Sequence, residues 1–190
     1  ASGTDEEEGI GDLIVVDIGG ATTDIHSIAD GEPTRPGVIK TGLQEPYAKR
    51  TVEGDLGMRV SAESLWQTVA TRKIKKFAPN LSYNVQERCN YLAQHVNEIP
   101  KTSEEIEFDE AMSMAATEVA MERHVGVLED VYTPMGKVYS LNGKDLSNAK
   151  YVIGTGGVLI YSENPERILK AGLYSEENPK YLKPKKPKLL

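Results

Sequence analysis

Apolar and polar residues alternate at the start of the chain, a pattern typical of β-strands. Residues 12–17 form a short, mostly β-branched apolar run that stops at Gly19-Gly20, residues 22–29 alternate, and residues 38–41 form another short run. Asp30-Gly31 between them is typical of a hairpin turn. The pattern predicts two or three antiparallel strands in this part of the chain.

From about residue 61 the spacing of apolar residues becomes helical. One predicted helix begins near Leu65, Trp66 and Val69, and a second presents one apolar face made of Val85, Cys89, Leu92 and Val96. Thr102 and Glu105 have the spacing of a capping box, which predicts that a third helix starts there and continues towards Gly126. Its buried face is expected to contain Phe108, Met112, Ala115, Ala116 and Val119.

The last third returns to strands. Residues 137–141 and 151–153 are predicted strands, and the second of them runs into a glycine-rich turn. Asn164 and Pro165 have the order of a helix N-cap and first turn. The chain is thus expected to have an acidic N-terminal segment, a strand-rich start, a mostly helical part, a return to strand and helix, and an extended, solvated, basic tail (1–10, 11–50, 51–136, 137–175 and 176–190).

Composition excludes several classes of function. The net charge of -7 disfavours nucleic-acid binding, and no apolar stretch has the length of about 20 residues that a membrane span needs. The N-terminal residues lack the pattern of a signal peptide, so we expect a cytoplasmic protein. The single cysteine, Cys89, forms no internal disulfide and is expected to be packed, and His26, His95 and His124 have no metal-ligand spacing.

The first candidate site follows the first strand, at Asp17 to Asp24. Gly19 and Gly20 allow backbone N–H groups to approach a phosphate, and the hydroxyls of Thr22 and Thr23 supply further donors. Asp17 is placed to hold magnesium through water or to orient an attacking water, whereas Asp24 is a weaker metal candidate. The alternative is an ordinary tight hairpin, whose glycines satisfy the turn and whose threonines suit a strand.

A second glycine turn after a strand favours a binding role for both turns, because two such turns in one chain are less easily accidental than one. Residues 154–157, Gly154-Thr155-Gly156-Gly157, follow a predicted strand and would let a nucleoside lie against the backbone. Between the two turns, Glu53 and Asp55 belong to an acidic, glycine-containing turn before a helix, and they are further candidates for nucleoside binding. A plain turn remains an alternative for each segment.

These motifs resemble those of a known superfamily. The segment from Asp17 to Asp24 is similar to the phosphate-2 motif, and residues 152–157 to the adenosine motif, of the actin-like (ASKHA) ATPases. A narrower resemblance is to the glutamate mutase L (MutL or GlmL) proteins, which share only a name with the mismatch-repair protein. It is carried by three sequence segments, DLIVVDIGGATTDIHS, TVEGDLGMR and YVIGTGGVLIYSENPERIL.

The resemblance implies an α/β, ribonuclease-H-like lobe of an actin-type ATPase, with a mixed sheet, flanking helices and a mostly helical insertion. It implies ATP or ADP with Mg²⁺ as cofactors, and adenosylcobalamin-dependent mutase subunits as partners of an accessory or reactivating ATPase. The superfamily's phosphate-1 motif is absent from this sequence. We therefore expect a missing N-terminal lobe of the same protein as a further partner, and no ATP turnover by this chain alone.

Two other functions remain open at this point. The first is a protein-interaction lobe without turnover, in which Met112, Met114 and Met121 form an adaptable contact surface, although methionines at helical spacing are more often core residues. The second is a small-molecule kinase or a hydantoinase-type relative with the same core, for which the sequence offers no substrate-binding residue.

Overall fold

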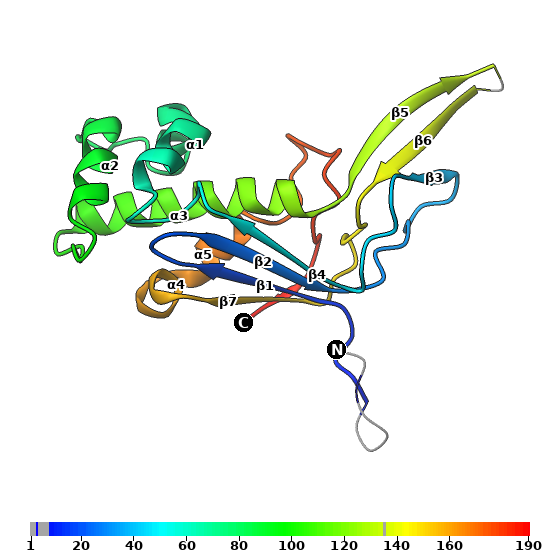
Figure 1. The fold of residues 1–190 in the computed structure, drawn as a ribbon, viewed down its shortest axis with the longest axis horizontal. Helices are drawn as coiled ribbons and strands as arrows, with labels where there is room; N and C mark the ends of the chain where they lie inside the picture. Colours follow the sequence, from blue (N-terminus) through cyan, green and yellow to red (C-terminus); the bar gives the residue numbers. More distant parts are fainter. Residues whose placement is uncertain (1–2, 4–7, 135) are drawn as a thin grey trace.

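The computed structural model describes residue 3, residues 8–134 and residues 136–190, so most of the acidic N-terminal segment lies outside the described residues. The chain forms strands, then helices, then strands and short helices (Figure 1). The elements are β1 (Leu13–Ile18), β2 (Thr23–Ile28), β3 (Val38–Thr41), β4 (Ala48–Glu53), α1 (Ala62–Phe77), α2 (Val85–Gln94), α3 (Ser103–His124), β5 (Val127–Thr133), β6 (Gly136–Asn142), β7 (Tyr151–Thr155), α4 (Gly157–Tyr161), α5 (Pro165–Lys170) and β8 (Lys188–Leu189).

The main sheet has five strands in the order β4-β2-β1-β7-β8. Strand β2 pairs antiparallel with both β1 and β4, whereas β7 and β8 extend the sheet in parallel with β1. A mixed α/β fold is therefore confirmed. The strand predicted at residues 38–41 is confirmed as β3, but it lies in another sheet, and the third antiparallel strand of the main sheet is β4. Strand β4 was missed because its alternate residues Ala48, Arg50 and Val52 are exposed, which leaves the segment without an apolar run.

The core lies on one face of this sheet. Ile14, Val16 and Ile18 are fully buried there; α3 packs on β1 and β2, and α5 packs on β7 (Figure 1). Successive strand residues point to opposite faces, so Leu13, Val15 and Asp17 lie on the other face, where they are partly buried.

Helix α3 runs through the middle of the molecule and is buried along most of its length. The predicted capping box is confirmed, because Thr102 accepts from the N–H of Glu105 and the Glu105 carboxylate accepts from the N–H of Thr102. Met112, Met114 and Met121 are all buried. The alternative in which these methionines form a contact surface was therefore wrong.

Helix α1 packs beside α3, where its Lys73 pairs with Glu118, and α2 packs on α1, away from the sheet (Figure 1). Helix α1 consists of two pieces that meet at Ala70. Cys89 is fully buried, as expected. Val96 was wrongly placed on the buried face of α2: the helix ends at Gln94, where the N–H of His95 closes the last turn, and Val96 is exposed beyond it. No helix in the described part of the chain is long and apolar enough to cross a membrane.

A smaller three-stranded sheet, in the order β3-β6-β5, projects from the other end of α3 (Figure 1). Strand β3 joins it in parallel with β6, which explains why residues 38–41 do not belong to the main sheet. Strand β5 was not predicted, because its outer residues Glu129 to Thr133 are exposed and show no apolar face.

The C-terminal residues are part of the fold, so the prediction of a solvated tail was wrong. Leu182 and Lys183 are buried, and the N–H of Leu182 donates to the carbonyl of Gly126. The Lys183 ammonium lies 3.2 Å from Glu122 of α3, which explains how a buried lysine is tolerated. Beyond it, β8 adds a fifth strand to the main sheet. Composition alone could not show that backbone pairing with distant segments orders this lysine-rich stretch.

Candidate functional site

The two glycine turns that follow β1 and β7 lie in contact. Asp17 and Thr155 are partners in the parallel register of these strands. Gly156 has a positive φ of 94°, and a Cβ atom there would lie 2.3 Å from the carbonyl oxygen of Ile18 and 2.8 Å from Oδ1 of Asp17. Only glycine fits this position. The first turn can therefore pack directly against the second.

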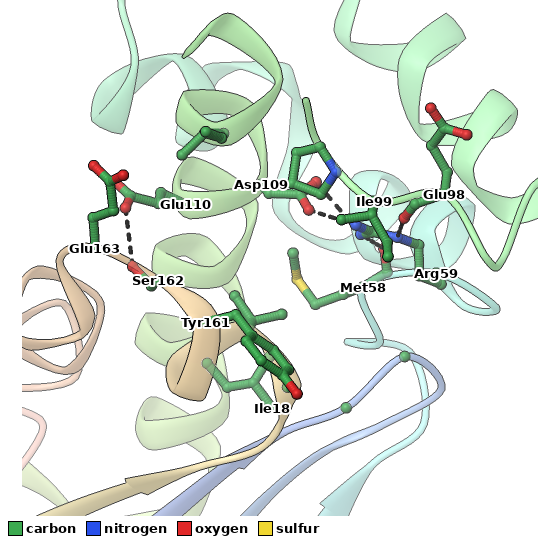
Figure 2. Close-up of a pocket in the computed structure, with 16 residues that line it drawn as sticks. Ile18, Met58, Arg59, Glu98, Ile99, Asp109, Glu110, Tyr161, Ser162 and Glu163 are labelled. Atoms are coloured by element: carbon green, nitrogen blue, oxygen red, sulfur yellow. Dashed lines mark hydrogen bonds and ion pairs between the residues drawn. The ribbon is translucent and has the colours of Figure 1, made fainter. Parts of the chain in front are cut away.

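A cavity of about 520 Å³ opens beside both turns (Figure 2). Gly19 and Gly20 of the first turn and Gly157 of the second line it. The remaining lining comes from the end of β1, the segment after β4, the α2–α3 loop, α3, α4 and the two residues after α4. These residues, apolar and charged, are Ile18, Met58, Arg59, Glu98, Ile99, Pro100, Ile106, Asp109, Glu110, Val158, Tyr161, Ser162 and Glu163. Its volume is in the range of small-molecule sites.

The first glycine turn is held by its carbonyl groups and by the N–H of Gly19, which donates to the carbonyl of Thr22 at 2.9 Å. The carbonyls of Gly19 and Gly20 accept from the N–H groups of Met58 and Arg59, at 3.0 and 2.8 Å. Within the described part of the chain, the N–H groups of Gly20, Ala21 and Thr22 donate to no protein acceptor. Successive free amides in a turn form a concavity that suits an anion.

The polar groups of the cavity are mostly paired. Arg59 forms an ion pair with Asp109 of α3, and Nε of Arg59 donates to the carbonyl of Glu98 at 3.0 Å (Figure 2). Burial raises the pKa of Asp109 even though Arg59 favours its charged form. Glu110 accepts from the hydroxyl of Ser162 at 3.0 Å. The cavity is thus a partly apolar space with fixed carboxylates along one wall.

Several predicted site residues have other contacts. The hydroxyl of Thr23 is fully buried and donates to the carbonyl of Leu56 at 2.7 Å, so in this structure it points into the core. Gly154 lies within β7, and a Cβ atom there would meet the side chains of Leu159 and Leu169. Thr22 remains partly exposed in the turn. Of the residues predicted to contact phosphate, the backbone of the turn and Thr22 are the ones whose polar groups are not already engaged in the core.

Glu53 and Asp55 lie outside the lining of this cavity. Both are paired with Arg123 of α3, at 2.6 and 2.8 Å, and Thr68 donates to Asp55 at 2.8 Å. The hydrogen bond from Arg123 lowers the pKa of Asp55, and these carboxylates in turn raise the pKa of Arg123. In this structure the acidic turn therefore connects β4 to α3 through Arg123, which a local sequence pattern cannot reveal.

The carboxylates proposed for metal binding are Asp17 and Asp24, which face each other across β1 and β2. One oxygen of Asp24 pairs with Arg50 at 2.7 Å, and its other oxygen is buried without a hydrogen bond. Among the described residues, no group of three or more His, Cys, Asp or Glu side chains is arranged to hold a metal ion. A magnesium ion here would fit only as one carried by a phosphate and water, as is common for Mg²⁺.

Sequence reasoning missed Arg59 and Asp109. Arg59 lies in the segment TVEGDLGMR, but no local pattern shows that its side chain reaches α3. Asp109 lies three residues before Met112, so it falls beside the predicted apolar face of this helix. An acidic residue at such a position is a sequence signal for a buried, paired carboxylate. The pairing became visible only with the tertiary structure.

Together these features define a class of protein: a mixed α/β chain in which two glycine turns meet beside one cavity bounded by a helical part. Residues 1–190 match the family model of the MutL protein. The chain is also 62% identical, over 187 residues, to Protein MutL of Clostridium tetanomorphum; the alignment covers 98% of this chain and 40% of that relative. The chain therefore belongs to the MutL protein family, and it spans about two fifths of the length of this curated relative.

Proposed function

We propose that this chain is the nucleotide-binding lobe of an actin-type ATPase that serves as an accessory or reactivating protein for an adenosylcobalamin-dependent mutase such as glutamate mutase. The observation that carries the proposal is the pair of glycine turns beside one cavity. The first turn has three free amides and lines the cavity with Gly19 and Gly20, and the second turn lines the same cavity with Gly157.

The first turn provides the phosphate contacts. The N–H groups of Gly20, Ala21 and Thr22 are free, and the carbonyls of Gly19 and Gly20 are held by neighbouring backbone, so the turn needs no rearrangement to accept phosphate oxygens. Asp17, two residues before Gly19 and outside the residues that line the cavity, would hold Mg²⁺ through water. The ion would neutralise phosphate charge, and Asp17 would orient its hydration shell.

The cavity provides the space for the nucleoside. Ile18, Met58 and Tyr161 line it and offer apolar surface to a flat base (Figure 2). Glu110, at the other wall, is a hydrogen-bond acceptor of the kind that binds ribose hydroxyls. Gly157 has open space where a Cβ atom would stand, so a ligand can lie against its backbone.

The strand order supports an actin-type lobe. Three antiparallel strands, β4, β2 and β1, are extended by the parallel strands β7 and β8, and a mostly helical part separates the two glycine turns along the chain. The mutase partner rests on the resemblance of the motif segments to the glutamate mutase L group. Lobe movement on nucleotide exchange would then transmit the change to the mutase.

Nucleotide titration of the intact protein tests the site. Gly157→Val adds bulk inside the cavity at a position with open space, and Gly54→Val adds the same bulk in an exposed turn outside it, also without a steric contact. We expect Gly157→Val to weaken ADP and ATP binding by at least about tenfold, or 1.4 kcal/mol, and Gly54→Val to leave it unchanged. Absence of nucleotide binding to the wild type, or equal effects of the two variants, would contradict the assignment.

Two further measurements test the ATPase and the partner. Asp17→Asn should abolish ATP hydrolysis by the intact protein while leaving its unfolding midpoint nearly unchanged; full turnover by this variant would refute the role of Asp17. Co-purification with an adenosylcobalamin-dependent mutase should depend on whether ADP or ATP is present. If no mutase subunit associates under either condition, the accessory role is wrong and only the nucleotide site remains.

A further inference from the structure

One side chain connects the glycine turn to the helical part of the chain. The segment Leu56–Ser61 lies along the turn that follows β1. A Cβ atom at Gly57 would stand 2.3 Å from the backbone carbon of Ala21, so the two segments are in direct backbone contact. The hydroxyl of Ser61 donates to the carbonyl of Ala21 at 2.7 Å. The N–H groups of Met58 and Arg59 donate to the carbonyls of Gly19 and Gly20. All three of these turn carbonyls therefore accept a hydrogen bond from the segment Leu56–Ser61.

The side chain of Arg59 continues from this segment into the helical part. Its guanidinium donates to the carbonyl of Met58 at 2.8 Å, to the carbonyl of Glu98 in the α2–α3 loop at 3.0 Å, and to the carboxylate of Asp109 in α3. Only 13% of the Arg59 side chain and 10% of the Asp109 side chain are exposed. An ion pair with this burial and a forked geometry resists separation much more than a surface pair does.

We infer that Arg59 is a positioning residue that makes the glycine turn and the α2–α3 loop move as one unit. This inference rests on the proposed function and adds its regulation. Because Ile99 and Pro100 of the same loop line the cavity, a ligand that contacts both walls would stabilise the link, and a partner that displaces the helical part would loosen the phosphate turn. Arg59 holds the turn through its backbone neighbours, and the inference requires no contact between its side chain and the nucleotide.

Hydrogen exchange of backbone amides tests this link without any ligand. The amides of residues 58 and 59 donate to Gly19 and Gly20, so they report whether the turn stays docked. In the intact protein we expect Arg59→Ala to speed exchange of these two amides by at least about tenfold, and Arg59→Lys to have a smaller effect because it keeps the charge opposite Asp109 but loses the forked donors.

Arg88→Ala is the matched control. Arg88 lies in the same helical part, and its side chain is also 13% exposed. It pairs with Glu105 and stacks over the rings of Tyr83 and Tyr91, which do not belong to the segments that hold the turn. We expect Arg88→Ala to leave exchange at residues 58 and 59 unchanged. Equal acceleration by the Arg59 and Arg88 variants, or no acceleration by Arg59→Ala, would overturn the inference.

A second measurement separates this inference from the proposed function. ADP should bind the Arg59→Ala variant at least about tenfold more weakly than the Arg88→Ala variant. If the wild type binds no nucleotide but Arg59→Ala still frees the turn amides, the proposed function fails and the mechanical link stands. If the wild type binds ADP and the Arg59 and Arg88 variants bind it equally well, the coupling is wrong and the proposed function stands.

Discussion

Replacing the buried His124 should change how stability depends on pH. The His124 ring is fully buried between α3 and the main sheet, where Nδ1 lies 2.9 Å from the hydroxyl of Thr51 and Nε2 lies 2.8 Å from the hydroxyl of Ser27. Burial, reinforced by the positive charges of Lys49 and Lys144, lowers the pKa of His124 from 6.5 to about 3. The native state therefore keeps this ring neutral at any pH above that value.

The sign of the effect follows from proton uptake by the two states. Between pH 6.5 and about pH 3 the unfolded chain binds a proton on His124 and the native chain does not, so the unfolded state gains stability as the pH falls. Each pH unit below 6.5 costs about 1.4 kcal/mol, and from pH 7 to pH 5 the free energy of unfolding should fall by about 2 kcal/mol from this residue alone.

Urea unfolding of the chain at pH 7, 6 and 5 measures this loss. His124→Gln keeps a donor and an acceptor but cannot be protonated, so its stability should fall by about 2 kcal/mol less than that of the wild type over this range, whatever its stability at pH 7. His95→Gln, at an exposed histidine, is the control and should follow the wild type. Parallel losses in the wild type and His124→Gln would refute the argument that the native structure excludes the charged ring.

Two further predictions concern packing. Cys89 is fully buried, and burial raises the pKa of its thiol to about 12. A thiol reagent at pH 8 should therefore react with the native chain only as fast as the chain opens. Rapid stoichiometric labelling would contradict the burial of Cys89. Gly57→Ala forces a Cβ atom to within 2.3 Å of the Ala21 backbone and should lower the free energy of unfolding by about 1–3 kcal/mol. The control Gly54→Ala has open space around its Cβ position and should have a far smaller effect. Equal urea midpoints for the two variants would contradict the contact.

Local sequence signals determined the parts of this protein that depend on neighbouring residues. The apolar run of β1 and the glycines after it predicted a strand that ends in a tight turn, and β7 with its glycine turn followed the same logic. The capping box at Thr102 predicted the first turn of α3, because its two hydrogen bonds join residues only three positions apart. The register that brings Asp17 beside Thr155 was not predictable, since these residues are distant along the chain.

Only the tertiary structure decided which segments meet. Strand β4 looks polar along the chain because one of its faces is exposed, and it becomes a strand by pairing with β2. The lysine-rich end is ordered by backbone bonds to Gly126 and by pairing with β7. Arg123 pairs with the acidic turn that the sequence suggested for the nucleoside, while Arg59 reaches Asp109 beside the cavity. Charged residues can pair with many partners, so their final contacts depend on the packing of helices and strands that lie far apart in the sequence.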